Sequence, residues 1–579
     1  MLPYAPSGES FRAVDRLYHA WQGRLTSAVS PAAVALAFQD WASHLGNSPG
    51  KQTELAFKAL SKWSRWADFA CRCHMETHAP DAIDPLPQDH RFDHAGWRMP
   101  PFRMLQQGFL LTQQWWHNAT TDVSGVSPHH QDVVAFMARQ WLDVFSPANF
   151  LATNPELLET TFHEGGNNLL RGARNALGDW NRLMSGMPPP PPADFVVGQD
   201  VAVTPGNVVY RNGLMELIQY TPATTEVYAE PVLITPAWIM KYYILDLSPE
   251  NSLVRYLVAQ GHTVFMISWV NPGEDDRDIG LADYLDRGFY RALSVVRRLI
   301  PDVPVHTVGY CLGGTLLAIA LAALRGEAQR QVASMTLFAA QTDFSEAGEL
   351  MLFIDPAQVA YLDDVMWDQG YLDPKQMVAA FQLLRANDLI WSRMTRSYLL
   401  GREETITDLM AWNADSTRLP FRMHSEYLHR LFLANDLAEG RYRVDDQPIA
   451  LTDIHVPVFA VGTETDHVAP WRSVYKIKLL TDTAVTFVLT NGGHNAGVIS
   501  EPGHPHRHFR IGTRTEGDPY LDPDEWQASL APVDGSWWPA WAEWLARHSG
   551  ATVPARPPER GRDRGTSLPD APGTYVHMS

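Results

Sequence analysis

The chain has few cysteines and no long apolar run. Only three of its 579 residues are Cys, namely Cys71, Cys73 and Cys311. This number excludes a disulfide framework and is consistent with a protein of the reducing cytosol. No apolar stretch approaches the roughly 20 residues that span a bilayer, and the longest, 315–324, has the length of a core helix. Residues 1–21 lack the basic and apolar regions of a secretion signal. We therefore expect a cytoplasmic protein with no transmembrane segment.

Two further absences narrow the function. No Walker or dinucleotide-binding glycine fingerprint follows any predicted strand, which excludes the nucleotide-hydrolase and hydride-transfer classes. The formal net charge is −19, whereas a general nucleic-acid binder needs a basic surface to neutralise phosphates. We expect no nucleic-acid partner.

Apolar and aromatic residues, by contrast, are plentiful. Hydrophobic residues make up 45% of the chain, which contains 20 Trp, and this composition is typical of a folded protein. The length favours one large catalytic domain with a second domain appended.

The pattern along the chain predicts three regions. Residues 1–190 alternate helical patterns with Pro or Gly breaks and predict an α-helical N-terminal domain. The five prolines Pro188–Pro192 cannot continue a helix and mark the predicted domain boundary. Residues 191–550 form the predicted catalytic domain. Residues 551–579 form a C-terminal tail that is either poorly ordered or held only by lying on the body.

Beyond the prolines, short β-rich runs alternate with helical segments. This alternation predicts a mostly parallel sheet with helices on both faces, in which ligands bind at the carboxyl ends of the strands. The stretch 343–453 interrupts the alternation and predicts a helical insertion, which either caps the site or only adds core. The β-rich runs are Val208–Tyr210, Leu214–Tyr220, Pro231–Thr235, Thr263–Ser268, Val303–Val308, Ser334–Ala339, Val456–Val461 and Val485–Thr490.

The segment Val305–Gly314 predicts a strand, a sharp turn and the start of a helix. It matches the nucleophile elbow G-x-S-x-G with Cys311 in place of Ser. Small residues at 309 and 313 let the strand and the helix approach each other. The helix N-terminus favours a thiolate and a developing oxyanion. The alternative is that Cys311 is a small buried hydrophobe in an ordinary turn.

The order of two later motifs favours catalysis. Asp466 follows the run 456–461, and His494 follows the run 485–490. Enzymes of the α/β-hydrolase fold present nucleophile, acid and His in this order, each after a strand. Either residue alone could be structural, since Asp often caps a helix and His often lies in a solvated turn. Together the motifs predict a catalytic triad of Cys311, Asp466 and His494.

The same fold class predicts where the oxyanion would be held. We expect an α/β-hydrolase sheet with a helical cap insertion, preceded by the helical domain. The oxyanion hole would use the backbone N–H of Leu312 and one from the loop after 231–235, near Ile239.

Other candidate residues are weaker. Glu464 and Asp343 are lesser candidates for the acid and His467 for the base, and solvated-loop roles are preferred for Glu464 and His467. The segment Cys71–His74 has three soft ligands but no second ligand pair at finger spacing, so a structural zinc is not expected. We interpret three further histidines as loop residues, namely His504, His506 and His508. We therefore expect no bound metal.

With these motifs in hand, the sequence resembles the class I polyhydroxyalkanoate synthases, the poly(3-hydroxybutyrate) polymerases of bacteria. The similarity covers nearly the whole chain. The matching segments are Ser146–Pro155, Gly165–Gly166, Val197–Gly198, Lys241–Leu247, Gly261–Phe265, Gly309–Gly314, Trp412–Asp415, Asp466–Trp471, His494–Ile499, Gly535–Trp538 and Ala571–Val576.

The resemblance implies an acyltransferase that polymerises (R)-3-hydroxyacyl-CoA, with 3-hydroxybutyryl-CoA as the expected substrate, and releases CoA. It implies Cys311 as acyl carrier, no cofactor beyond the CoA of the substrate, a homodimer, and association with cytoplasmic polyester granules. Trp238–Met240 and His506–Phe509 depart from the family pattern, which leaves the preferred monomer length open. One alternative is a thioesterase or polyester depolymerase of the same fold. Another is a non-catalytic granule scaffold, but the intact triad argues against a scaffold.

Overall fold

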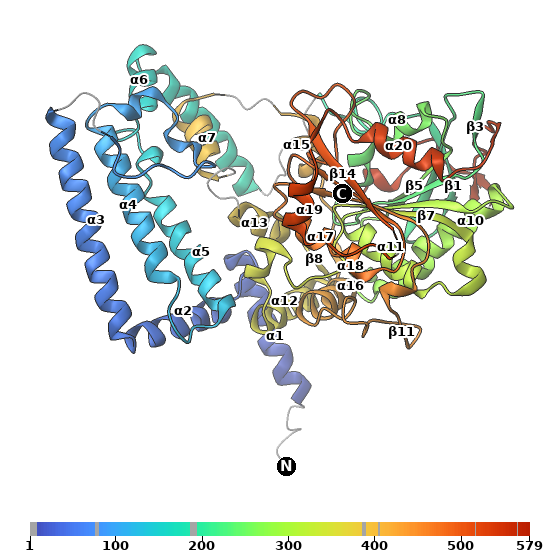
Figure 1. The fold of residues 1–579 in the computed structure, drawn as a ribbon, viewed down its shortest axis with the longest axis horizontal. Coiled ribbons are helices and arrows are strands. Elements are labelled where there is room, and N and C mark those ends of the chain that lie inside the picture. Colours follow the sequence, from blue (N-terminus) through green and yellow to red (C-terminus); the bar gives the residue numbers. More distant parts are fainter. Residues whose placement is uncertain are drawn as a thin grey trace. The chain divides into compact units, whose positions relative to one another are not determined.

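The computed structural model describes residues 8–75, 80–185, 194–384, 390–402, 406–515, 517–563 and 565–579, and the chain folds into two compact units (Figure 1). The catalytic unit comprises Met1–Ala28, Pro191–Met377 and Ile406–Ser579. The helical unit comprises Val29–Pro190 and Val378–Thr405. The predicted boundary at 188–192 lies outside the described residues.

The helices of the helical unit begin at strong sequence signals. Ser30 and Ser127 each precede a proline, and their hydroxyls accept hydrogen bonds from the N–H groups of Ala33 and His130, which caps α2 and α5. Helices α3, α4 and α5 lie side by side in Figure 1. The helices are α2 (Pro31–Gly46), α3 (Pro49–Met75), α4 (Phe102–Thr120), α5 (Pro128–Val144), α6 (Pro155–His163) and α7 (Asn167–Ser185).

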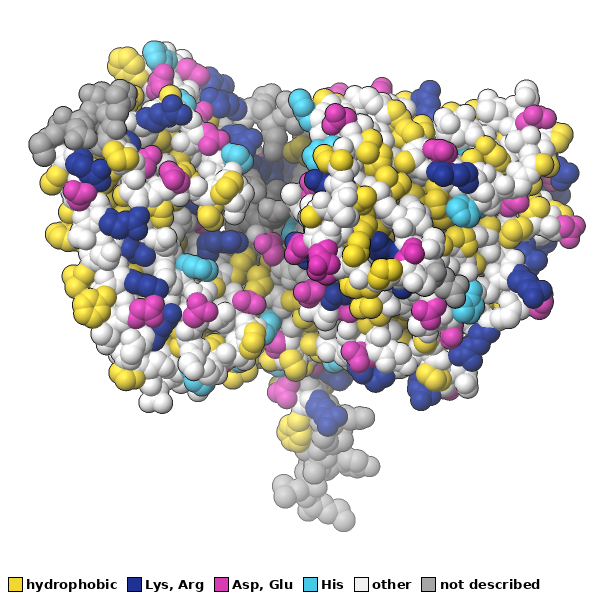
Figure 2. All heavy atoms as spheres, in the orientation of Figure 1, with side chains coloured by type: hydrophobic (Ala, Val, Ile, Leu, Met, Phe, Trp, Pro, Cys, Tyr) yellow, Lys and Arg dark blue, Asp and Glu magenta, His cyan; other side chains and the backbone are white. Residues whose placement is uncertain are grey.

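Part of the predicted insertion, Val378–Thr405, belongs to the helical unit. The predicted division at residue 190 places the whole insertion in the catalytic domain. Helix α7 binds the returning segment through polar side chains: Asn168 Nδ2 donates to Leu399 O at 2.9 Å, and Tyr398 OH donates to Asp179 Oδ2 at 2.7 Å. The segment contains α14 (Ser392–Met394) and the π-helix η10 (Thr395–Leu399). The exposed apolar residues of α7 are Leu170, Leu177, Trp180 and Met184. Figure 2 shows further apolar side chains on the surface of this unit.

The first helix also departs from the predicted division, because α1 (Gly8–Thr26) belongs to the catalytic unit. It packs against α12 (Pro356–Gln369) of the insertion. His19 Nδ1 lies 2.8 Å from Asp364 Oδ2, and Arg24 NH2 lies 3.3 Å from Asp368 Oδ2. These polar contacts accompany close packing between the two helices, where the ring centroids of His19 and Tyr361 are 5.3 Å apart.

The catalytic unit is built on one ten-stranded sheet. Pairing is parallel across its six central strands, from β5 to β13, and antiparallel at both edges. In spatial order the strands are β1 (Gly206–Arg211), β2 (Met215–Tyr220), β5 (Val264–Trp269), β4 (Val232–Thr235), β6 (Val305–Tyr310), β7 (Val332–Phe338), β12 (Val458–Thr463), β13 (Val485–Thr490), β14 (His508–Arg514) and β15 (Val533–Asp534).

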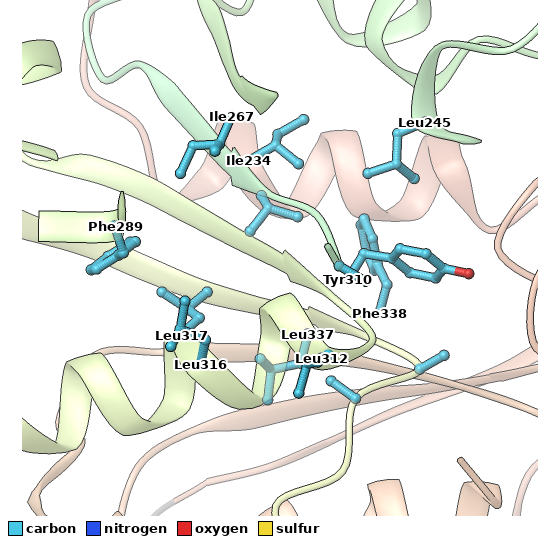
Figure 3. Packing of buried hydrophobic residues seen from close by; sticks show 14 of the residues in the cluster. Ile234, Leu245, Ile267, Phe289, Tyr310, Leu312, Leu316, Leu317, Leu337 and Phe338 are labelled. Carbon is cyan, nitrogen blue, oxygen red and sulfur yellow. The ribbon is translucent and has the colours of Figure 1, made fainter. Parts of the chain in front are cut away.

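Helices cover both faces of this sheet, so the prediction of an α/β-hydrolase architecture is confirmed (Figure 1). They include α8 (Leu253–Ala259) and α20 (Trp538–Arg547) on one face, and α10 (Arg291–Leu299) and α11 (Leu312–Ala323) on the other. The central strands are rich in apolar residues and buried along their whole length, because both faces of the sheet are covered. Figure 3 shows how Leu312, Leu316 and Leu317 of α11 join this core.

The insertion between β7 and β12 is mainly helical, as predicted. Two short ladders interrupt its helices, β8 (Tyr371–Leu372) with β9 (Leu419–Pro420) and β10 (Arg443–Val444) with β11 (Gln447–Pro448). Its principal helices are α12, α13 (Pro374–Leu384), α15 (Asp408–Ala414), α16 (Phe421–Glu426) and the π-helix η11 (Tyr427–Leu433). In the part of the chain that the structure describes, no helix is both long and apolar enough to cross a bilayer.

The C-terminal tail lies on the body of the catalytic unit, the second of the two predicted alternatives. Strand β16 (Thr552–Pro554) pairs with β3 (Glu226–Tyr228). Farther along, the N–H groups of Thr574 and Tyr575 donate to the buried carboxylate of Glu216, at 2.8 and 3.0 Å. The tail is therefore fixed by backbone hydrogen bonds.

Buried histidines make the stability of the catalytic unit sensitive to acid. His262 is 1% exposed and stacks on Tyr228 at 4.8 Å between ring centroids, and neither of its ring nitrogens has a hydrogen-bond partner among the described residues. Burial lowers the pKa of His262 to about 4. Because the unfolded chain takes up this proton near pH 6.5 and the folded chain does not, stability is full above pH 6.5 and falls below it.

We expect the free energy of unfolding to drop by about 1 kcal/mol between pH 7.5 and 5.5 on account of His262. Urea unfolding at both pH values measures this drop. The variant His262→Phe keeps a ring against Tyr228 but cannot titrate, so its drop should be smaller by that amount. An equal drop in both proteins would remove His262 as the cause.

Candidate active site

Cys311 lies at the tip of a strained turn between β6 and α11. Its backbone adopts φ 51° and ψ −126°, a conformation that side-chain-bearing residues rarely adopt. A Cβ on Gly313 would lie 2.2 Å from the carbonyl oxygen of Thr235, and one on Gly309 would lie 2.4 Å from Gly314 Cα. Glycine is therefore required at both positions, as the elbow motif predicts.

Asp466 and His494 are brought together at the same edge of the sheet. Asp466 follows β12 and His494 follows β13, two parallel neighbours whose carboxyl ends lie together. His494 Nδ1 lies 2.8 Å from Asp466 Oδ2. The other carboxylate oxygen accepts the N–H groups of Val468 and Ala469, each at 2.8 Å. These bonds fix the carboxylate and leave Nε2 of the imidazole available.

The charges of the site favour a protonated imidazole. Burial is the strongest influence on His494 and acts to lower its pKa, but the charges of Asp466 and Cys311 and hydrogen bonds to both raise the pKa well above its usual value. Burial likewise acts to raise the pKa of Asp466, but the charge of His494 and its hydrogen bonds hold it below the usual value. His494 thus interacts with the thiol on one side and the carboxylate on the other.

The loop after β4 lies against the start of α11, where the oxyanion hole is predicted. The close approach of Gly313 to Thr235 places this loop beside the first turn of the helix. Leu312 is the first residue of α11, so its N–H has no acceptor within the helix. Ile239 lies in the β4 loop, and its carbonyl accepts the N–H of Thr417 at 3.2 Å.

Tyr310 and Asn495 connect the parts of the site. Both lie in the sequence motifs, but the motifs alone give them no role. The hydroxyl of Tyr310, which points away from the apolar cluster in Figure 3, donates to Asn495 Oδ1 at 2.6 Å. Asn495 Nδ2 lies 3.3 Å from Asn413 Oδ1 in α15 of the insertion. The strand before Cys311, the His494 loop and the insertion are therefore joined by hydrogen bonds.

Of the weaker candidates, both carboxylates have other partners. Glu464 Oε1 lies 3.1 Å from Arg510 NH1, and Asp343 Oδ1 lies 3.7 Å from Lys476 Nζ. The carboxylate that contacts His494 is Asp466.

The candidate metal ligands whose side chains the structure describes are not gathered into a site. His504 Nδ1 lies 2.7 Å from Glu501 Oε1, and His508 is the first residue of β14 rather than a loop residue. His508 Nε2 lies 3.6 Å from Glu464 Oε2. Within the described residues, no group of three or more His, Cys, Asp or Glu side chains is arranged to hold a metal ion. The side chain of His74 lies outside the described residues.

Comparisons with known proteins identify the family of the chain. Two family profiles for the N-terminal region of poly-beta-hydroxybutyrate polymerases match residues 9–51 and 88–257, and an alpha/beta hydrolase fold profile matches residues 230–499. Among solved structures, a thioesterase domain from the curacin biosynthetic pathway covers 51% of this chain and 94% of that chain, at 15% identity and a TM-score of 0.29, a likeness too weak to bear on function.

Curated relatives cover most of the chain. A poly(3-hydroxyalkanoate) polymerase of Methylorubrum extorquens is 40% identical over 91% of this chain and 88% of that protein. Polymerase subunits of Rhizobium etli and Cupriavidus necator are 37% and 36% identical, over 85% and 86% of this chain and 78% and 84% of those proteins. The chain therefore belongs to the poly(3-hydroxyalkanoate) polymerases, a family of acyltransferases.

Proposed function

We propose that this protein polymerises (R)-3-hydroxyacyl-CoA, with 3-hydroxybutyryl-CoA as the first substrate to test, through an acyl-enzyme on Cys311. The observation that carries the proposal is the position of Cys311 on the strained elbow, at the same edge of the sheet as an imidazole whose Nδ1 lies 2.8 Å from Asp466 Oδ2. The raised pKa of His494, to which Cys311 contributes, supports this arrangement. Thioester exchange between CoA and a protein thiol is nearly balanced in energy, so it keeps the acyl group reactive.

In the acylation step, His494 takes the proton of Cys311 and the sulfur attacks the acyl-CoA carbonyl carbon. The carbon–sulfur bond to CoA then breaks, and the proton held by His494 goes to the departing CoA sulfur. Asp466 orients the imidazole and stabilises its positive charge, in keeping with the raised pKa of His494.

In the extension step, the 3-hydroxyl of a bound acyl unit attacks the thioester carbon on Cys311. An ester bond forms, the bond to the Cys311 sulfur breaks, and the hydroxyl proton is transferred through the His494–Asp466 pair to that sulfur. During both steps, the N–H groups of Leu312 and of the loop near Ile239 would hold the oxyanion. The approach of that loop to α11 supports this assignment.

Polymerisation also requires that water be kept from the acyl-enzyme, and we assign this task to the insertion. Its residue Tyr427 packs against Phe344 and Phe432, with ring centroids 6.0 and 5.1 Å apart. Burial, with a smaller contribution from Cys311, raises the pKa of Tyr427, so its phenol stays neutral and lies within electrostatic reach of the thiol. An apolar cap over Cys311 would favour ester formation over hydrolysis.

The remaining expectations form part of the same proposal. A homodimer at the surface of cytoplasmic polyester granules, needing no metal or separate cofactor, would suit an enzyme whose product is an apolar solid. A thioesterase or depolymerase would use the same three side chains but release soluble hydroxy acid. A scaffold would not need them.

Incubation of the purified protein with 3-hydroxybutyryl-CoA tests the function. We expect release of free CoA thiol together with insoluble polyester. Thiol release with only soluble 3-hydroxybutyrate would favour the thioesterase, and no thiol release would contradict the proposed substrate.

A further inference from the structure

A buried lysine lies two residues after the proposed oxyanion donor. Lys241 is 4% exposed, and its ammonium donates to the carbonyl oxygens of Met578 and Tyr575, the latter at 3.4 Å. Both acceptors belong to the C-terminal tail. A cation removed from water needs such acceptors, because its desolvation is otherwise costly. The tail therefore supplies the environment that keeps this ammonium buried.

The tail is itself firmly anchored to the sheet. Glu216 in β2 is fully buried and accepts the N–H groups of Thr574 and Tyr575. The hydroxyl of Tyr575 donates to Asn212 O at 2.6 Å, and Val576 is 3% exposed. The carbonyl groups that face Lys241 thus have fixed positions relative to the sheet.

On its other side, the loop is held by the insertion. The carbonyl of Lys241 accepts the indole N–H of Trp412 at 2.8 Å, and Met240 forms an isolated antiparallel bridge with Ser416. The N–H of Thr417 donates to Ile239 O at 3.2 Å. Residues 238–241 are therefore clamped between the insertion and the tail.

We propose that Lys241 and the C-terminal tail form a brace that positions the loop carrying the Ile239 N–H for acyl transfer. Lys241 is then a positioning residue: it does not touch the reacting atoms, but it fixes the loop that does. This inference rests on the proposed function of Ile239. A shift of about 1 Å in such a donor lowers turnover by about 100-fold without weakening substrate binding.

The variant Lys241→Met tests the brace, because it removes the ammonium and keeps a long apolar side chain. We expect kcat for CoA release to fall by about 10- to 100-fold and KM to change by no more than about 3-fold. Alkylation of Cys311 by iodoacetamide should proceed within about 2-fold of the wild-type rate, since the nucleophile is intact.

Lys478→Met is the matched control. Lys478 is also a buried lysine, 3% exposed, with its ammonium 4.7 Å from the ring centroid of Tyr475. Because this contact lies on α18 (Ile477–Leu480) and the helix before it, away from the β4 loop, we expect kcat within about 2-fold of wild type. A similar loss of kcat in both variants would overturn the brace, because any buried lysine would then have the same effect.

Deletion of residues 575–579 gives a second test. If this variant folds, combining it with Lys241→Met should lower kcat no further than either change alone, since each change removes the same two hydrogen bonds between Lys241 and the tail. Additive losses overturn the brace, as does Lys241→Met with unchanged kcat or with equal losses of kcat and Cys311 alkylation. Failure of the proposed function is recognised separately, because the wild type would then either release no CoA or release CoA without forming insoluble polyester.

Discussion

Replacing Cys311 by alanine should lower CoA release from 3-hydroxybutyryl-CoA by about 10⁴-fold or more, because the reaction loses its nucleophile. Polyester should also be absent. Initial rates of thiol release, together with recovery of insoluble product, measure both effects. The backbone strain at φ 51° is the same for Ala and Cys, so we expect the variant to fold with an unchanged melting temperature.

Cys73→Ala is the control for the thiol. Cys73 lies on α3 of the helical unit, and its sulfur is 3.7 Å from Arg103 NH1. We expect wild-type turnover in this variant. Substantial turnover by Cys311→Ala would instead mean either that water attacks the substrate directly or that the protein is a scaffold and a contaminating enzyme is active. A repeat with independently purified protein separates these two outcomes.

Replacing Asp466 by asparagine should lower kcat by about 10²- to 10⁴-fold with little change in folding. The amide keeps an oxygen for the Val468 and Ala469 N–H groups but presents an N–H to His494 Nδ1, which favours the wrong tautomer of the imidazole. The loss of the carboxylate charge also removes the main attraction that raises the pKa of His494. Rates at saturating substrate measure this effect.

Glu464→Gln is the matched control, because it neutralises a carboxylate two residues away that pairs with Arg510. Its kcat should stay within about 2-fold of wild type, since exposed or half-buried ion pairs contribute little. If Glu464→Gln were the more damaging of the two substitutions, the assignment of the acid would be wrong.

The strands and the elbow can be predicted from sequence because their signals are local. The strands before Cys311, Asp466 and His494 are buried along their whole length and rich in apolar residues, as is typical of strands that are covered on both faces. The glycines at 309 and 313 are demanded by contacts within a few residues or with the adjacent strand. Chain order then places the three side chains at one edge. The sequence pattern does not predict β14, because its residues are mixed polar and apolar, as an antiparallel edge region allows.

The division into units and the brace depend on contacts that no local pattern reports. Helix α1 joins the catalytic unit through His19 and Asp364, which are 345 positions apart. Lys241 reaches Met578 across 337 positions. A single lysine after a strand predicts a surface charge, and only the folded tail makes it a buried one.

Peptide mass spectrometry after reaction with butyryl-CoA tests the central claim most directly. This analogue lacks the 3-hydroxyl, so it can acylate the nucleophile but cannot extend a chain. We predict one butyryl group in thioester linkage on the peptide that contains Cys311, present in wild type and absent in Cys311→Ala. A butyryl group on Cys71, Cys73 or a serine, with Cys311 unmodified, would contradict the assignment of Cys311 as the acyl carrier.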